Sequence, residues 1–221
     1  MEDILSVYRR PQDSSRPLVC MDECPKQLIG ETRRPLPVAT GCPERYDTEY
    51  VRNGTCNQFM FVAPFEGWRR VAVTERKTRI DWARQIRKLV DEDFPYAEKV
   101  ILVMDNLNTH SPASLYEAFG PAEAKRIWDR LEIHHTPKHG SWLNMAEIEL
   151  SVLNHHGLSE RIAGIEIMRS EIGAWQKQRN EQKCKIKWSF TIEKARDKMR
   201  KTYPRLEPVF IKWNKCDITT L

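Results

Sequence analysis

The chain has 221 residues, of which 40% are hydrophobic and 30% charged, and its formal net charge is +5 at pH 7. This length is enough for one large domain with its own core, and the composition excludes a disordered chain. No apolar run approaches the roughly 20 residues that cross a bilayer, and the first ten residues lack the apolar core of a signal peptide. We therefore expect a cytoplasmic protein with no membrane partner, whose six cysteines are reduced.

The N-terminal part combines a polar start with one apolar run. Residues 1–16 are polar and contain proline and serine, which predicts a linker. Residues 17–22 (PLVCMD) form an apolar run closed by Asp22, the pattern of a buried strand that ends on a carboxylate. From Glu23 to Glu49 prolines and glycines alternate with basic residues, which predicts an irregular surface excursion suited to contact phosphate.

A hairpin and a helix are expected next. Residues 54–65 and 68–74 are rich in Thr, Phe, Val and Trp and flank Glu66-Gly67, so they predict a β-hairpin. Thr78 and Asp81 have the spacing of a helix start, and the apolar face that follows ends before Pro95.

A second apolar run ends abruptly on a carboxylate. Val100–Met104 are too few for a helix and lack polar alternation, so they predict a buried strand of a parallel sheet. Ligands of open α/β sheets bind beyond the carboxyl ends of the strands, where Asp105 falls, with Asn106, Asn108 and His110 around it. The alternative is that Asp105 opens a turn or caps the following helix. A helix capped by Ser111 and ended by Gly120, then a strand over 131–135, complete a mixed sheet with helices packed on it.

The third candidate acidic group lies on a later helix. Ser141 can cap a helix that runs to about His156 and is closed by Gly157. Glu147 lies on or beside the apolar stripe of that helix, where a carboxylate is costly unless a metal ion or another partner neutralises it. It could instead be an ordinary glutamate that reaches water, and Glu149 has an apolar neighbourhood of its own. Spacing alone leaves Glu147 and Glu149 unresolved.

Asp22, Asp105 and one of these glutamates would suit two-metal phosphoryl chemistry. Magnesium prefers oxygen ligands and needs only one or two carboxylates for each ion. Two such ions can activate the attacking oxygen and stabilise the leaving oxygen of an in-line displacement.

Five motifs in consistent order between residues 17 and 204 carry a family resemblance. The chain resembles the DDE-type transposases of bacterial insertion sequences related to mariner elements, on residues 19–23 (VCMDE), 50–55 (YVRNGT), 102–110 (LVMDNLNTH), 136–147 (TPKHGSWLNMAE) and 188–191 (WSFT). The resemblance implies an α/β, ribonuclease H-like fold with a mixed five-stranded sheet flanked by helices. It also implies a DDE endonuclease and strand transferase that uses two Mg²⁺ or Mn²⁺ ions, with the catalytic, metal-binding triad on Asp22, Asp105 and Glu147. Glu23 and Asn106 are expected to hydrogen-bond these carboxylates.

The resemblance also sets the expected domain organisation. We expect a linker over residues 1–16, a catalytic core over 17–157, a basic helical part over 158–204 and a tail over 205–221. Family members usually carry helix-turn-helix modules ahead of the catalytic domain, and this sequence begins almost at the first catalytic strand. We therefore expect that N-terminal DNA-binding domain to be absent, and a separate helix-turn-helix subunit could supply it. The family further implies DNA as substrate and a homodimer in the synaptic complex.

Basic residues gather in the C-terminal third of the chain. Residues 176–201 hold ten Lys or Arg against three acids, a pattern that gives sequence-independent affinity for phosphate. The expected DNA-binding residues are Lys138, His139, Arg179, Lys183, Lys185 and Lys187. The sequence thus predicts a metal-dependent transposase catalytic domain; the alternatives are an inactive DNA-binding remnant or another ribonuclease H-like nuclease.

Overall fold

The computed structural model describes residues 1–43, 45–158, 160–201 and 203. The chain divides into two compact units, Met1–Ser189 and Phe190–Leu221. The first unit holds the whole sheet. In the second unit the structure describes helix α7 (Ile192–Lys198), which the Thr191 side chain caps. The predicted tail over 205–221 lies outside the described residues.

One five-stranded mixed sheet organises the first unit, in the order β3-β2-β1-β4-β5. Its strands are β1 (Leu18–Glu31), β2 (Tyr50–Ala63), β3 (Trp68–Thr74), β4 (Val100–Met104) and β5 (Leu131–His135). β1, β2 and β3 pair antiparallel, whereas β1, β4 and β5 pair parallel. The sheet confirms the predicted mixed architecture and both predicted apolar strands.

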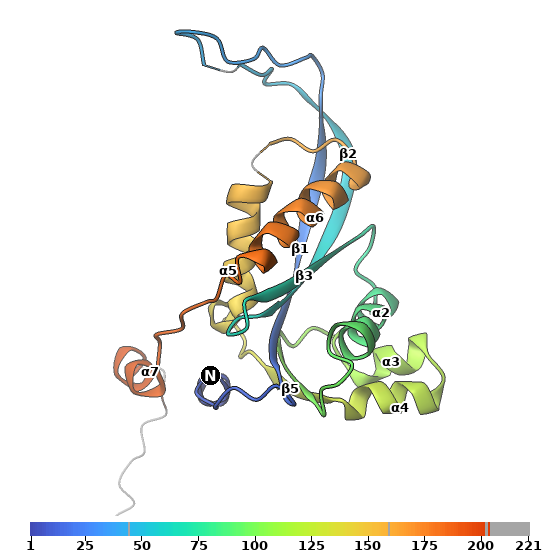
Figure 1. The fold of residues 1–221 in the computed structure, drawn as a ribbon, viewed down its shortest axis with the longest axis vertical. Coiled ribbons are helices and arrows are strands. Elements are labelled where there is room, and N and C mark those ends of the chain that lie inside the picture. Colours follow the sequence, from blue (N-terminus) through green and yellow to red (C-terminus); the bar gives the residue numbers. More distant parts are fainter. Residues whose placement is uncertain (44, 159, 202, 204–221) are drawn as a thin grey trace, which may run out of the picture. The chain divides into compact units, whose positions relative to one another are not determined.

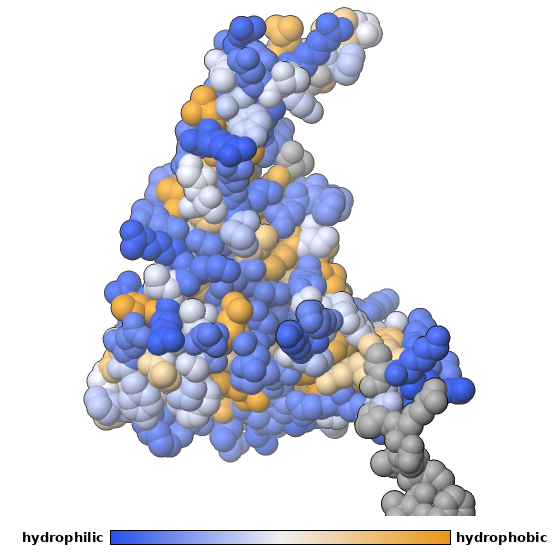
Figure 2. Space-filling model, turned by 180° about the vertical axis from the view of Figure 1, so that it is seen from behind, coloured by the Kyte–Doolittle hydropathy of each residue, from blue (hydrophilic) through white to orange (hydrophobic). Residues whose placement is uncertain are grey.

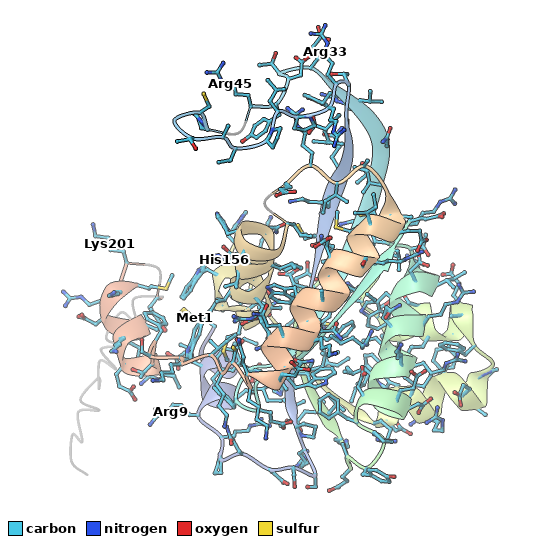
Figure 3. The ribbon with its side chains drawn as sticks, turned by 45° about the horizontal axis from the view of Figure 1, so that its top comes forward. Met1, Arg9, Arg33, Arg45, His156 and Lys201 are labelled. Carbon is cyan, nitrogen blue, oxygen red and sulfur yellow. The ribbon has the colours of Figure 1, made fainter. Side chains whose placement is uncertain are left out.

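β1 is longer than the apolar run predicted. We expected the strand to end at Asp22, but it continues to Glu31, paired with β2 through to Tyr50. Most positions of the continuation are exposed or half-buried, and its outer part pairs with β2 alone, so it lacks the apolar signal of the first part. The irregular excursion is therefore confined to the connection between the two strands, residues 32–49, where Figure 3 shows Arg33 and Arg45.

The main hydrophobic core lies between one face of the sheet and three helices. α2 (Arg79–Lys88) starts in the predicted capping box of Thr78 and Asp81 and continues as a π-helical turn, Leu89–Asp93. α3 (Pro112–Ala118) and α4 (Pro121–Asp129) follow β4 and cover the same face (Figure 1). Only one helix was predicted here, because Gly120 was interpreted as a helix end. The structure places it as the N-cap of α4, with Pro121 in the first turn.

The opposite face of the sheet carries α5 (Met145–Val152) and α6 (Ile165–Glu181) (Figure 1). The helix predicted over 141–156 is in fact three pieces. A 3₁₀ turn (Ser141–Leu143) precedes α5, and a π-helical turn (Leu153–Gly157) follows it. The cap of α5 is Asn144, not Ser141, because the Asn144 side chain accepts the backbone N–H of Ala146.

The N-terminal residues form a helix where a linker was predicted. α1 (Glu2–Tyr8) buries one apolar side, and its Tyr8 hydroxyl donates a hydrogen bond of 2.7 Å to the carbonyl of Leu143. The overall polarity of residues 1–16 concealed this short apolar cluster, which consists of Ile4, Leu5, Val7 and Tyr8.

In the part of the chain that the structure describes, no helix has the length and apolar character needed to cross a membrane. The face shown in Figure 2 is mainly hydrophilic, with small separate apolar patches. The five described cysteines are free thiols, as predicted.

Candidate active site

The first candidate acidic residue lies in the central strand of the sheet. Asp22 is part of β1 and is paired in register with Met60 of β2. Val19 and Met21 point into the core under α2–α4. Because alternate residues of a strand point to opposite faces, Asp22 points to the face that carries α5 and α6.

The second candidate, Asp105, follows the last residue of β4. β4 is the parallel neighbour of β1, and Cys20 lies opposite Val103. Two residues further along each strand, the same register brings Asp22 level with Asp105. The two aspartates are therefore far apart in sequence but close in space, because their strands are neighbours in the sheet.

The third candidate, Glu147, lies in the first turn of α5. Asn144 fixes the start of this helix, because its side-chain N–H donates a 2.8 Å hydrogen bond to the carbonyl of Met21. That carbonyl belongs to the residue before Asp22. The buried Asn144 amide therefore connects α5, which carries Glu147, to β1, which carries Asp22.

The charges of the three carboxylates act on one another. Burial is the largest cause that raises the pKa of Asp22 to about 6, and the negative charges of Asp105, Glu147 and Glu23 raise it further. The backbone N–H of Glu23, 2.8 Å from Asp22 Oδ1, opposes this shift. The site thus holds more negative charge than its surroundings compensate, which is the environment that binds a cation.

Within the described ranges, no three His, Cys, Asp or Glu side chains are already arranged around one point as a metal-binding group. Three carboxylates without a cation repel one another, which opposes a ligating arrangement. Asp105 Oδ1 is buried and lies 2.7 Å from His110 Nδ1, but this contact lacks the geometry of a hydrogen bond. The donor set is oxygen only and anionic, which fits a hard divalent ion.

His110 is buried between two of the acids, with 3% of the residue exposed. Its Nδ1 lies 2.7 Å from Asp105 Oδ1, and its Nε2 lies 2.9 Å from Glu23 Oε1. The ring also stacks on Trp82, with centroids 5.5 Å apart. The sequence predicted His110 only as a group near Asp105; its partner Glu23 comes from another strand, so no local pattern could reveal the bridge.

The structure distinguishes Glu147 from Glu149. Glu149 is only 1% exposed, and its carboxylate lies 3.1 Å from Arg69 Nε on β3 and accepts hydrogen bonds of 2.8 and 3.1 Å from Arg179 on α6. Two guanidinium groups therefore neutralise Glu149. Glu147 is half-buried, and its charge acts on Asp22. No local pattern in the sequence could identify Arg69, on β3, as a partner of Glu149.

The remaining predicted site residues differ from one another in exposure and in contacts. Glu23 contacts His110 and also lies 3.8 Å from Lys77 Nζ, whereas Asn106 is exposed. Lys138 and His139 are exposed in the loop between β5 and the 3₁₀ turn, but Arg179 is engaged with Glu149. Lys183, Lys185 and Lys187 are exposed beyond the end of α6.

Comparisons with known proteins identify the family and the fold. A family model described as DDE superfamily endonuclease matches residues 17–168. A search of curated proteins finds no match.

Three similar solved structures share 15–17% sequence identity with the chain, and each match covers 83% of it. They are the Mos1 mariner paired end complex with Mn (TM-score 0.54), the Mos1 strand transfer complex (0.57) and a pre-cleavage Mos1 transpososome (0.52). The match covers 54% of the Mos1 chain in the first two and 59% in the third, so this chain spans little more than half of their length. The likeness confirms the predicted ribonuclease H-like fold.

Proposed function

The chain belongs to the DDE superfamily of endonucleases, and from this membership we propose that it is the catalytic domain of a transposase. Its reaction would be metal-dependent cleavage of a DNA phosphodiester followed by strand transfer. The observation that carries the proposal is that Asp22 on β1 lies level with Asp105, which follows the adjacent strand β4, while Glu147 lies on a helix anchored to β1.

Asp22, Asp105 and Glu147 are the residues that we propose as metal ligands. Enzymes of this superfamily use divalent metal ions, and we propose two Mg²⁺ or Mn²⁺ ions here. Bound ions would supply Lewis acidity to the scissile phosphate and acidify the attacking water. The all-oxygen donor set and the uncompensated negative charge on Asp22 support this assignment.

Two sequential displacements would follow. In the first, water attacks the phosphorus, a new P–O bond forms, and the bond to the 3′ oxygen breaks to free a 3′ hydroxyl. In the second, that hydroxyl attacks a phosphodiester of target DNA and displaces another oxygen. No covalent protein intermediate is needed, so the protein acts by stabilising charge in the transition state and by positioning the reacting groups.

Several neighbouring residues would keep the carboxylates in place. His110 and Glu23 orient Asp105, and Asn144 fixes the beginning of the helix of Glu147. Arg69 and Arg179 hold Glu149 on the side of α5 that faces β3 and α6, which keeps a competing carboxylate away from the metal ligands.

We further propose that Lys138 and His139 contact the scissile strand. Both are exposed in the loop that leads to the helix of Glu147, and His139 has a left-handed backbone (φ 62°), an uncommon conformation. Arg179 is left out of the proposed DNA contacts because its guanidinium is bound to Glu149. A homodimeric synaptic complex and a helix-turn-helix module, in the same longer protein or a separate subunit, complete the proposal.

Supercoiled plasmid and pre-cut element ends incubated with Mn²⁺ or Mg²⁺ test the activity. The wild type should nick the plasmid and join the ends only with metal, and Asp105→Asn should abolish both. Asp129→Asn is the matched control, because Asp129 lies on α4 and pairs with Lys125 at the surface. Metal-dependent nicking that survives Asp105→Asn would contradict the proposal, as would DNA binding without any cutting by the wild type, the behaviour of an inactive remnant.

A further inference from the structure

Tyr8, the last residue of α1, is buried against the beginning of the helix that carries Glu147. Its hydroxyl donates a 2.7 Å hydrogen bond to the carbonyl of Leu143, which ends the 3₁₀ turn and directly precedes Asn144, the N-cap of α5. Burial raises the pKa of Tyr8 far above its usual range, so the hydroxyl stays protonated and able to donate. The contact therefore joins the N-terminal helix to the turn from which α5 starts.

The Tyr8 hydroxyl also contacts the strand of Asp22. The Cys20 thiol lies 3.5 Å from the Tyr8 oxygen, and it is the donor there because the phenol proton is directed to Leu143. Cys20 is fully buried, and it points to the same face of β1 as Asp22, two residues later. The backbone N–H of Met145, the first residue of α5, interacts with both the phenol and the thiol. Tyr8 thus lies where β1 and the beginning of α5 meet.

α5 is too short to fix its own position. It has eight residues and lies between a 3₁₀ turn and a π-helical turn, so no regular helix continues it. Helices of this length are marginal in isolation and depend on tertiary contacts. At its beginning, the Asn144 amide is bonded to the carbonyl of Met21, and the carbonyl of Leu143 is bonded to Tyr8. Glu147, in the first turn, is held in place by the same contacts.

The Tyr8 ring is itself held by a motif that the proposed reaction does not use. Trp188, the first residue of the WSFT motif, packs edge-on against this ring, with centroids 5.2 Å apart and an interplanar angle of 70°. On the same helix as Tyr8, Asp3 Oδ2 lies 2.7 Å from Nδ1 of His134 on β5. These contacts fix α1, and with it the direction of the Tyr8 hydroxyl.

We propose that Tyr8 is a positioning residue for Glu147, which it holds in the metal-binding position through the carbonyl of Leu143 and the first turn of α5. The inference rests on the proposed function and deepens it, because it takes Glu147 as a metal ligand. Such a ligand must be held within about 0.5 Å of its productive position. Loss of the hydroxyl frees the turn and weakens metal binding through Glu147. A tyrosine that only attached α1 would affect stability and leave metal affinity unchanged.

The test is isothermal titration of Mn²⁺ into the DNA-free protein, in which no cleavage can occur. Tyr8→Phe removes the hydroxyl and keeps the ring. It should weaken Mn²⁺ affinity by about 3–30-fold, the range expected when one contact of a coupled network is lost. In the plasmid assay, the Mn²⁺ concentration for half-maximal nicking should rise by the same factor. The rate at saturating Mn²⁺ should stay within about twofold of the wild type, because the chemical groups are unchanged.

The matched control is Ile4→Val. Ile4 is fully buried on the same helix, and its shortening costs stability comparable to the loss of a buried hydrogen bond. Both variants should therefore show a similar decrease in Tm, but Ile4→Val should keep the Mn²⁺ affinity of the wild type. All titrations are run well below the lowest Tm. An equal loss of affinity in Ile4→Val, or an unchanged affinity in Tyr8→Phe, overturns the proposal.

Two further backgrounds show whether the effect passes through Glu147. In Glu147→Gln, the addition of Tyr8→Phe should leave the residual Mn²⁺ affinity unchanged, because the ligand that Tyr8 positions is gone. In Asp105→Asn, the same addition should still weaken Mn²⁺ binding. An equal loss in both backgrounds contradicts the proposal. A wild type that binds no Mn²⁺ overturns the proposed function together with this inference, whereas equal binding with and without the Tyr8 hydroxyl overturns the inference alone.

Discussion

His110 bridges Asp105 and Glu23, with its two ring nitrogens 2.7 Å and 2.9 Å from their carboxylate oxygens. Burial alone would lower the pKa of His110, but the adjacent carboxylates of Asp105 and Glu23 outweigh it and raise the pKa to about 9. A pKa in this range favours the imidazolium form at neutral pH. The ring connects Asp105, which follows β4, to Glu23 on β1, and it orients the Asp105 carboxylate.

His110→Gln should weaken metal-dependent nicking and Mn²⁺ affinity by about 10–100-fold, the usual effect of removing a group that orients a metal ligand. Isothermal titration with Mn²⁺ and the plasmid assay measure the two effects. His155→Gln is the control, because that histidine is exposed and bonds only the carbonyl of Ser151 among the described contacts. Wild-type metal affinity in the His110 variant would show that the bridge does not orient Asp105.

Asp22→Asn should stabilise the metal-free protein while removing its response to metal. The raised pKa means that ionised Asp22 costs folding free energy above about pH 6, and the cost disappears below about pH 4. At pH 7.5 the substitution should raise the free energy of unfolding by about 1–3 kcal/mol, an upward shift in Tm of several degrees. Mn²⁺ should raise the Tm of the wild type but not of this variant. A metal-free Tm below that of the wild type would contradict the expected cost of burying ionised Asp22.

The two glutamates of α5 should respond in opposite ways. Glu147→Gln should abolish nicking and leave the urea midpoint nearly unchanged, because Glu147 is half-buried and holds no structural ion pair in the described contacts. Glu149→Gln leaves the charges of Arg69 and Arg179 without their partner and should cost about 3–5 kcal/mol of stability. Urea unfolding and the plasmid assay on both variants separate the roles. A stable, fully active Glu149→Gln protein would show that the buried pair is dispensable.

Glu132 should make part of the stability depend on pH in the acid range. Hydrogen bonding to Arg10 is the main cause that lowers the pKa of Glu132 to about 2, with help from His134 and Arg16. A depressed pKa gives stability that is present above about pH 4.5 and is lost as the pH falls toward 2. After a discount for its partial exposure, Glu132→Gln should cost about 1–2 kcal/mol at pH 7. Denaturation curves at pH 7 and pH 3 should show this difference shrink; a constant difference would contradict the prediction.

Local patterns in the sequence predicted much of the fold. Val100–Met104 is buried throughout, the hairpin over 54–74 forms, and the capping box of Thr78 and Asp81 is present. Each of these features depends on residues close together in the chain, where periodicity and capping rules apply. β1 beyond Asp22 escaped prediction because a solvated two-stranded ribbon buries little apolar surface.

Contacts between distant segments could not be predicted in the same way. Glu147 and Glu149 have similar neighbourhoods along α5, and only Arg69 and Arg179, from β3 and α6, tell them apart. The partner of His110 is likewise on another strand. α1 was missed because its four apolar residues are hidden in a polar stretch and are buried only by tertiary packing.

The central claim is that Asp22, Asp105 and Glu147 bind the catalytic metal. Crystals soaked in MnCl₂ and measured at the manganese absorption edge test it most directly, because the anomalous signal locates each ion. The account predicts manganese peaks within about 2.0–2.4 Å of carboxylate oxygens from all three residues, and no peak there in Asp105→Asn. Peaks confined to other groups at saturating Mn²⁺, or peaks in the wild type that Glu147 does not contact, would contradict it.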